Sequence, residues 1–465
     1  MEIKVQITVK SEVGQPEVVR EVARLERGSL RSETLGLSLA EARAILGGLE
    51  KTMAERQAAE FVEQGRRCPH CGRERACKGH HRIVFRTPFG KLQLDSPQLY
   101  GCPCGRQGPQ SSSPLAELLA ERTSPELAYL ETKFAALVSY GLTIKLLEEV
   151  LPIGQDLSTR TIRRQVQQAA ERLEAELAQG RDAFLKAIPP DENAPSKPAA
   201  PLVVGLDGCY VHAKGQRSRT EGWFEVIVGK GLPTKDRSSK CFGFVSRYDP
   251  TPKRRLFEWL KAQGLQSHQP VTFLSDGGDT VRELPRGMHP KSEHLLDWFH
   301  VTMRLTVMGR MAKGVRADDQ PELSADLEEI LEHLKWNLWH GKIHRALEIV
   351  DELAYILDIK EGSPAHRKLL KAVRAFETYI TRNRAFIPNY GERYRQGKTI
   401  STGFAESAVN QVVSKRFVKK QQMRWSERGA HLLLQIRAQV LNGDWRPTLS
   451  RWYPRMKVMP EMKTA

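Results

Sequence analysis

A short apolar run behind a proline constrains the fold of this chain more than any other feature. The run at 202–204, LVV, lies between Pro201 and Gly205, and Asp207 follows shortly after it. Its length and partly β-branched composition favour a buried strand over a helix. A second such run, VTFLS at 271–275, is followed directly by Asp276. The sequence therefore predicts two buried strands, each of which delivers a carboxylate at its end.

A third carboxylate, Glu406, lies in the helix-like stretch STGFAESAVNQVVSKRF. A single aspartate after a strand most often caps a turn. Here glycines follow both aspartates, and they keep side chains away from that end of the sheet, which suits the approach of a phosphate backbone. Three carboxylates in this arrangement, in a basic chain with a separate cysteine cluster, indicate a metal-dependent phosphoryl-transfer site.

The charge of the chain indicates a polyanionic partner. Lys and Arg number 72 against 55 Asp and Glu in 465 residues, so the net charge is +17 and the pI is near 9.6. This balance favours nucleic acid, although ribosomal, chromatin and membrane-surface proteins share it. No apolar run approaches the roughly 18 residues that a spanning helix needs, and residues 1–10 alternate like a strand, without a signal-peptide core. We expect a cytoplasmic protein with no membrane contact.

Five of the seven cysteines fall between positions 68 and 104, which indicates a metal cluster rather than a disulfide framework. Two cysteine pairs form knuckles on either side of a predicted hairpin that turns at 88–90. Thiolates on two such turns can bind Zn²⁺ tetrahedrally in a zinc-ribbon-like module. The expected ligands of this structural zinc are Cys68, Cys71, Cys102 and Cys104.

Other ligand sets are compatible with the same sequence. The second pair is C-x-C rather than C-x-x-C, so Cys77, His80 or His81 could replace one ligand. A few unliganded buried cysteines are a further interpretation.

Two helix-like stretches follow, ELAYLETKFAALVSYGLTIKLLEEVLP and DLSTRTIRRQVQQAAERLEAELAQ. The first is broken at Gly141, and the second is capped by Ser158 or Thr159. A helix, a short turn and a helix with a basic beginning are typical of helix-turn-helix DNA readers, although an ordinary helical hairpin has the same pattern. The candidate DNA-binding residues here are Arg160, Arg163 and Arg164.

Beyond a Pro-rich linker, three antiparallel-type strands and a helix precede the strand at 271–275. This is the order of a ribonuclease-H-like α/β domain, in which the first and fourth strands lie side by side, so Asp207 and Asp276 would face each other. A helical insertion then interrupts the domain. The predicted segments are an α/β start at 1–66, the zinc-binding module at 67–110, the helix-turn-helix domain at 111–187, the linker at 188–201, the first part of the catalytic domain at 202–302, the insertion at 303–397, the C-terminal helices of the catalytic domain at 398–445 and a tail at 446–465.

Basic residues gather after Glu406, where an aromatic side chain, Trp425, could stack on an exposed base. A solvated charged face is the usual interpretation of such a run, but its position beside a candidate catalytic carboxylate favours phosphate binding. The candidate DNA-binding cations are Lys415, Arg416, Lys419, Lys420 and Arg424.

The order of these motifs is similar to that of the DDE transposases of bacterial insertion sequences, and most similar to the ISKra family, which is related to the Mutator-like group. The resemblance rests on Asp207 in LDG, Asp276 in SDGG, Asp297 and His300 in DWFH, a helical insertion, and Glu406 in TGFAESAVNQVVSKRFVKKQQMRW. It covers the chain from the cysteine cluster to Trp445 and is most specific over 402–442. The shortened second cysteine pair departs from the family pattern.

The resemblance implies that Asp207, Asp276 and Glu406 hold two Mg²⁺ or Mn²⁺ ions, and that the chain cleaves and joins DNA at the terminal inverted repeats of its element. It gives Asp297 and His300 an accessory role, although Asp297 could simply cap the next helix. It further implies double-stranded DNA as partner, a homo-oligomer and a bacterial, nucleoid-associated location. A nuclease without strand transfer and a non-catalytic zinc-bearing DNA-binding regulator are the alternatives.

Overall fold

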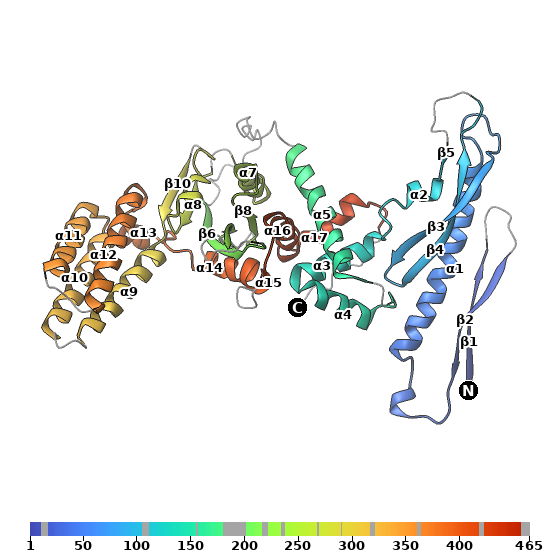
Figure 1. Ribbon diagram of the computed structural model, residues 1–465, viewed down its shortest axis with the longest axis horizontal. Coiled ribbons are helices and arrows are strands. Elements are labelled where there is room, and N and C mark those ends of the chain that lie inside the picture. The colour runs from blue at the N-terminus through green and yellow to red at the C-terminus, as the bar shows by residue number, and fades with distance from the viewer. Residues whose placement is uncertain are drawn as a thin grey trace. The chain divides into compact units, whose positions relative to one another are not determined.

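The computed structural model describes residues 1–10, 17–104, 111–154, 157–179, 201–215, 222–233, 238–266, 269–289, 291–316, 321–359, 364–417 and 423–456. The chain divides into two compact units, Met1–Ala169 with Asp444–Ala465, and Ala170–Gly443, whose elements are labelled in Figure 1. The architecture is multidomain and mixed α/β, as predicted. No helix in the described ranges is long and apolar enough to cross a membrane. The predicted linker falls outside these ranges apart from Pro201.

The first unit begins with a β-hairpin packed on a long helix. β1 (Glu2–Val9) is the strand that the alternation of residues 1–10 predicts, and it pairs antiparallel with β2 (Val18–Glu26). After η1 (Ser32–Thr34), Ser38 caps α1 (Leu39–Arg66) and forms a capping box with Glu41. The glycines at 47 and 48 do not interrupt α1. A side chain at Gly48 would meet Val22 at 3.0 Å, so this glycine lets β2 approach the helix.

A second hairpin carries the cysteine knuckles. β3 (Cys77–Thr87) and β4 (Gly90–Tyr100) pair antiparallel around the predicted turn, and β4 also pairs with β5 (Ser111–Ser112). Apolar side chains of this sheet pack with α1 and with α2 (Pro114–Leu118) in one small core.

The remaining helices of this unit are α3 (Pro125–Leu137), α4 (Tyr140–Val150), the first part of α5 (Thr159–Gln179) and α17 (Trp445–Trp452). The predicted break at Gly141 is wrong by a few residues, because the Ser139 hydroxyl caps α4 by accepting from the Leu142 N–H. The indole N–H of Trp445 donates to the Thr132 hydroxyl at 2.9 Å and fixes α17 on α3.

The second unit contains a five-stranded sheet in the order β10-β9-β6-β7-β8. Its strands are β6 (Leu202–His212), β7 (Trp223–Gly231), β8 (Cys241–Val245), β9 (Val271–Ser275) and β10 (Ser292–Leu296). β6, β7 and β8 are antiparallel neighbours, whereas β9 runs parallel to both β6 and β10. The predicted pairing of the first strand with the fourth is confirmed.

Helices cover both faces of this sheet. α7 (Pro252–Ala262) and α8 (Asp279–Glu283) pack on the face that presents Leu202, Val204 and Leu206. On the other side, α14 (Gly403–Val409) contacts β6 and β7, and α16 (Glu427–Leu441) contacts β8. The π-helical turn η3 (Asn410–Ser414) contacts α14, α16 and α15 (Lys415–Phe417).

A helical bundle is inserted between β10 and α14. It consists of α9 (Trp298–Arg316), α10 (Pro321–Trp339), α11 (Ile343–Ile359) and α12 (Pro364–Asn383), followed by η2 (Arg384–Phe386) and α13 (Tyr390–Arg395). Each of the four long helices contacts the next and α12 contacts α9, so they close a ring around one apolar core (Figure 1). β10 ends at Leu296, and α9 already begins at Trp298, which places His300 in the first turn of α9.

Candidate functional site

Three aspartates lie at one end of the sheet, on three adjacent parallel strands. Leu206 of β6 pairs with Ser275 of β9, and Ser275 pairs with Leu296 of β10. Asp207, Asp276 and Asp297 each come one residue after these partners. The shared register therefore brings the three together along one edge.

One detail of the prediction is wrong. Asp207 does not end its strand, because β6 continues to His212 in register with β7. What ends at Leu206 is the parallel pairing with β9, because β9 stops at the partner residue Ser275 while β6 continues for six more residues. Asp207 is thus a mid-strand residue beside the point where its neighbour has turned away.

Glu406 is brought to the same face of the sheet by a close helix–strand contact. A side chain at Gly205 would place its Cβ 2.7 Å from the Cβ of Ala405 and 3.0 Å from the Phe404 ring. Gly205 therefore allows α14 to lie directly on β6. Because successive strand residues alternate in direction, Gly205 and Asp207 face the same side. Glu406 follows Ala405 on that helix, so it reaches the Asp207 side of the sheet.

Asp297 ties the sheet edge to both flanking helices. Its fully buried carboxylate accepts from the Phe299 N–H at 2.9 Å, which caps α9, and from the Thr402 N–H at 3.1 Å. The Thr402 hydroxyl donates to the same carboxylate. Burial raises the pKa of Asp297, and the bond from Thr402 opposes that rise. The capping interpretation of Asp297 holds, and the same side chain also anchors the segment that begins α14.

The electrostatics show that the predicted residues influence one another. Burial first, and then the negative charge of Asp276, raise the pKa of Asp207 to about 6. Glu406 adds to this rise, whereas His300 and the Gly208 N–H oppose it. Asp207 is 9% exposed. A buried carboxylate beside two others is a place where a cation would relieve repulsion.

Hydrogen bonds fix both the side chain and the backbone of Asp276. Its side chain accepts from the Gly278 N–H at 3.0 Å, and its carbonyl accepts from the Tyr379 hydroxyl of α12 at 3.0 Å. Gly277 has φ +80°, and a Cβ there would meet Asn383 at 2.6 Å. Gly277 is therefore required by the turn and by the packing of α12.

The carboxylates of Asp207, Asp276 and Glu406 are near one another but do not form a closed ligand shell. Within the described part of the chain, one group of three or more Cys, His, Asp or Glu residues has its ligand atoms all within 4.8 Å of one another, and that group is Cys68, Cys71, Cys102 and Cys104. Carboxylate oxygens suit Mg²⁺ chemically, but the spacing of these three defines no coordination geometry.

The four cysteines cluster at metal-binding distance, as predicted. The Sγ atoms of Cys68 and Cys104 are 3.9 Å apart, and those of Cys71 and Cys102 are 3.3 Å apart. Backbone N–H groups of His70 and Cys71 lower the pKa of Cys68 to about 6, whereas hydrogen bonds to the neighbouring thiols and burial raise the pKa of Cys102 to about 12. The arrangement is compatible with a structural zinc.

The alternative ligands lie outside this cluster. The thiol of Cys77 donates to the Gly79 carbonyl at 3.3 Å, and His80 pairs with Asp95 at 2.6 Å. His81 is exposed on β3 and is not part of the group.

The predicted DNA-binding cations divide into exposed and buried residues. On α5, the Ser158 hydroxyl caps the helix through the Thr161 N–H at 3.1 Å, and Arg160, Arg163 and Arg164 are exposed. Lys415 and Arg424 are also exposed, whereas Lys419 and Lys420 lie outside the described residues.

The expectation that Arg416 and Trp425 face DNA is wrong. Arg416 is 2% and Trp425 8% exposed, and the guanidinium lies 5.2 Å from the indole ring centre. The Trp425 backbone also pairs with the end of β6, where its N–H donates to His212. The spacing of charged residues in the sequence did not reveal the burial of Arg416 and Trp425, because it depends on the pairing of the chain at Trp425 with the end of β6.

Sequence reasoning missed the residues that position the carboxylates. Gly205 and Thr402 carry no chemical signature, and Tyr379 lies in a helix far along the chain. Arg437 of α16 was also missed. It donates through Nε to the Val412 carbonyl at 2.7 Å and also to the Gln411 carbonyl, and so binds oxygens of the π-helical turn that follows α14.

Comparison with protein-family models gives no match, and no curated protein sequence matches the chain. Its function is therefore inferred from its own residues and from the resemblance of its motifs.

Substitution of Gly205 by Ala is expected to destabilise the second unit by about 1–3 kcal/mol, because the new methyl group overlaps Ala405. Urea unfolding followed by tryptophan fluorescence measures this change. Gly403→Ala, in the same helix but with open space around a Cβ, is the matched control. Equal stability of the two variants would contradict the proposed helix–strand contact.

The stability of the chain should also depend on pH through Asp207. Its folded pKa of about 6 lies above the ordinary 3.8, so its stabilising contribution is complete below pH 3.8 and is lost as pH rises through 6. In buffer without added divalent cation, the free energy of unfolding of Asp207→Asn should rise by about 2 kcal/mol relative to that of the wild type as the pH increases from 4 to 7. Glu283→Gln, at an exposed carboxylate, is the control. A difference in unfolding free energy between Asp207→Asn and the wild type that stays constant from pH 4 to pH 7 would count against the raised pKa of Asp207.

Cys71→Ser is expected to lose bound zinc, whereas Cys77→Ser, outside the cluster, should retain about one ion per chain. Metal content after gel filtration measures the difference. The first variant should also lose the thermal transition of the first unit while the second unit stays folded. Zinc at full occupancy in Cys71→Ser would rule out the four-cysteine site.

Proposed function

We propose that this protein is a DDE transposase that cleaves and joins DNA at the terminal inverted repeats of a bacterial insertion sequence. The observation that carries the proposal is the meeting of distant carboxylates. Asp207 within β6 and Asp276 directly after β9 each come one residue beyond the paired positions Leu206 and Ser275, and Glu406 lies on a helix packed on β6. The influence of Asp276 and Glu406 on the pKa of Asp207 supports this proximity.

The topology supports a ribonuclease-H-like catalytic domain. Three antiparallel strands lead through α7 to a fourth strand beside the first, and a fifth strand lies parallel to the fourth. The insertion falls between the fifth strand and the Glu406 helix, in the position that the resemblance implies. These features are consistent with the proposed fold and leave the carboxylates at the open edge.

Asp207, Asp276 and Glu406 would hold Mg²⁺ or Mn²⁺, because hard cations prefer carboxylate oxygens completed by water and phosphate oxygens. When bound, two such ions supply an activated oxygen nucleophile and stabilise the leaving oxygen of an in-line displacement. The protein residues contribute position and charge. Asp297 fixes the start of the Glu406 helix through Thr402, and His300 lies close enough to offset the charge of Asp207.

The remaining proposed partners follow from charge. The basic beginning of α5 and the zinc-bearing hairpin would bind the ends of the element, and the reaction on two ends implies a homo-oligomer in the bacterial cytoplasm.

Purified protein with Mg²⁺ and a labelled duplex that carries the DNA flanking the coding region tests the proposal. The wild type should nick this duplex and join its 3′-OH end to a second DNA. Asp207→Asn, Asp276→Asn and Glu406→Gln should each lower both rates by at least about 100-fold. Glu283→Gln, an exposed carboxylate on α8, should keep them.

The products separate the alternatives. Cleavage without joined product would identify a nuclease, and unchanged rates in all three carboxylate variants would leave the zinc-bearing DNA-binding regulator as the better interpretation.

A further inference from the structure

The four-helix bundle is divided by charge. α9 contains four basic residues and no acidic one, and α12 contains five basic residues and one acidic one, histidines aside. By contrast, α10 contains five acidic residues and one basic, and α11 contains four acidic and one basic. Because α9 contacts α12 and α10 contacts α11, the like-charged helices are neighbours in the ring. The bundle therefore has a basic side and an acidic side.

Four cations of α12 lie along one exposed stripe of the helix. Arg367, Lys371, Arg374 and Arg382, with Thr378 between the last two, recur every three or four residues and are exposed. The opposite side of the helix carries Leu369, Val373, Phe376 and Ile380, which are buried in the bundle core. From Arg367 to Arg382 the stripe is roughly 23 Å long at 1.5 Å per residue.

The protein pairs some of these cations itself. The Arg382 guanidinium lies 4.0 Å from the Asp279 carboxylate. Arg374 pairs with Glu377 at 3.2 Å, while Lys368 and Lys371 have no ionic partner within the described ranges. On α9, the exposed Arg304 lies over the Tyr379 ring at 4.1 Å. Exposed cations that the fold does not use are available to an anionic partner.

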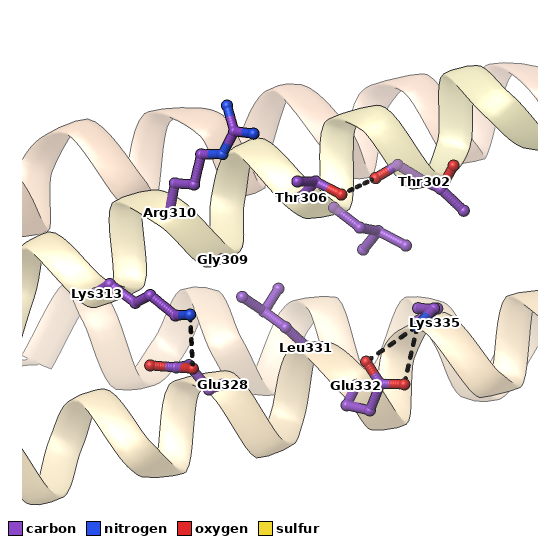
Figure 2. A pocket seen from close by; sticks show the side chains of 10 residues that line it. Thr302, Thr306, Gly309, Arg310, Lys313, Glu328, Leu331, Glu332 and Lys335 are labelled. Carbon is purple, nitrogen blue, oxygen red and sulfur yellow. Dashed lines mark hydrogen bonds and ion pairs between the residues drawn. The ribbon is translucent and has the colours of Figure 1, made fainter.

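Figure 2 shows where the basic side ends. A groove of about 350 Å³ lies between α9 and α10, and within it Lys313 reaches across to Glu328 at 3.8 Å. Arg310 points away from α10. The groove is thus the boundary at which the cations of α9 meet the acids of α10, and it is not itself an anion site.

The basic side is anchored at the carboxylate edge. The Tyr379 hydroxyl of α12 donates to the Asp276 carbonyl at 3.0 Å, and Arg282 of α8 donates to the Asn383 side chain at 3.3 Å. α9 begins directly after Asp297. Both basic helices therefore have one end at the candidate site.

We propose that the exposed basic side of α9 and α12 binds the phosphate backbone of double-stranded DNA that extends from the carboxylate edge. This inference rests on the proposed function, which supplies a DNA strand at that edge. A rigid row of cations about 23 Å long spans roughly seven base pairs of duplex at 3.4 Å each, and it contacts phosphates without reading bases.

The triple variant Lys368→Gln, Lys371→Gln, Arg374→Gln tests the proposal in the full-length protein, with a 30-base-pair random duplex and no divalent cation. The slope of log affinity against log salt concentration should become less negative by about 2 to 3. The affinity near 0.15 M salt should fall about 10- to 100-fold. The matched control, Lys335→Gln, Lys342→Gln, Arg345→Gln, removes three cations from the acidic side and should change affinity less than about twofold.

Three results would overturn the inference. These are an unchanged salt slope in the α12 variant, an equal loss in both triple variants, and a change in oligomeric mass or in binding to phosphatidylglycerol vesicles without a change in DNA binding. Because binding is measured without divalent cation, these outcomes are independent of the cleavage assay. If the α12 variant binds DNA like the wild type while the carboxylate variants lose cleavage, the basic-side proposal fails and the transposase proposal stands. If the α12 variant loses DNA binding while the carboxylate variants keep cleavage, the transposase proposal fails instead.

Discussion

The arrangement of the second unit depends on one buried carboxylate, that of Asp297. An ionised group without solvent is costly unless donors surround it. Asp297 receives hydrogen bonds from the Phe299 N–H and from both the N–H and hydroxyl of Thr402. These donors belong to a helix that begins beside it and to a segment 105 residues later. One side chain thus joins the last strand of the sheet to the start of the bundle and to the helix of Glu406.

This junction explains how a bundle can interrupt the sheet domain without separating its parts. The chain leaves the sheet at Asp297 and returns at Thr402, and the Trp298 N–H donates to the Ile400 carbonyl at 3.0 Å beside these contacts. Entry and exit of the insertion therefore meet at one point. The bundle has its own apolar core, in which Leu334, Leu353 and Leu369 are fully buried. It can fold locally while its two ends hold Glu406 in reach of Asp207.

The sequence contained enough information for the strands, the cysteine cluster and the neighbouring positions of Asp207 and Asp276. Those features depend on local patterns, namely short apolar runs, cysteine spacing and the order of elements. Gly205 was not identifiable, because its role depends on Ala405, two hundred positions away. Arg416 and Trp425 were misplaced for a related reason. Charged and aromatic residues in a helix-like run resemble a surface, and only the tertiary packing buries them.

The charge division of the bundle completes the electrostatic argument. A cluster of carboxylates is suited to cations, but by itself it repels a polyanion. A site that acts on phosphodiesters must therefore attract the backbone with groups that lie outside the reacting centre. Under the proposed function, the basic helices α9 and α12 would meet this requirement, since each has one end at the carboxylates and extends away from them. The acidic helices α10 and α11 complete the ring on the other side of its core.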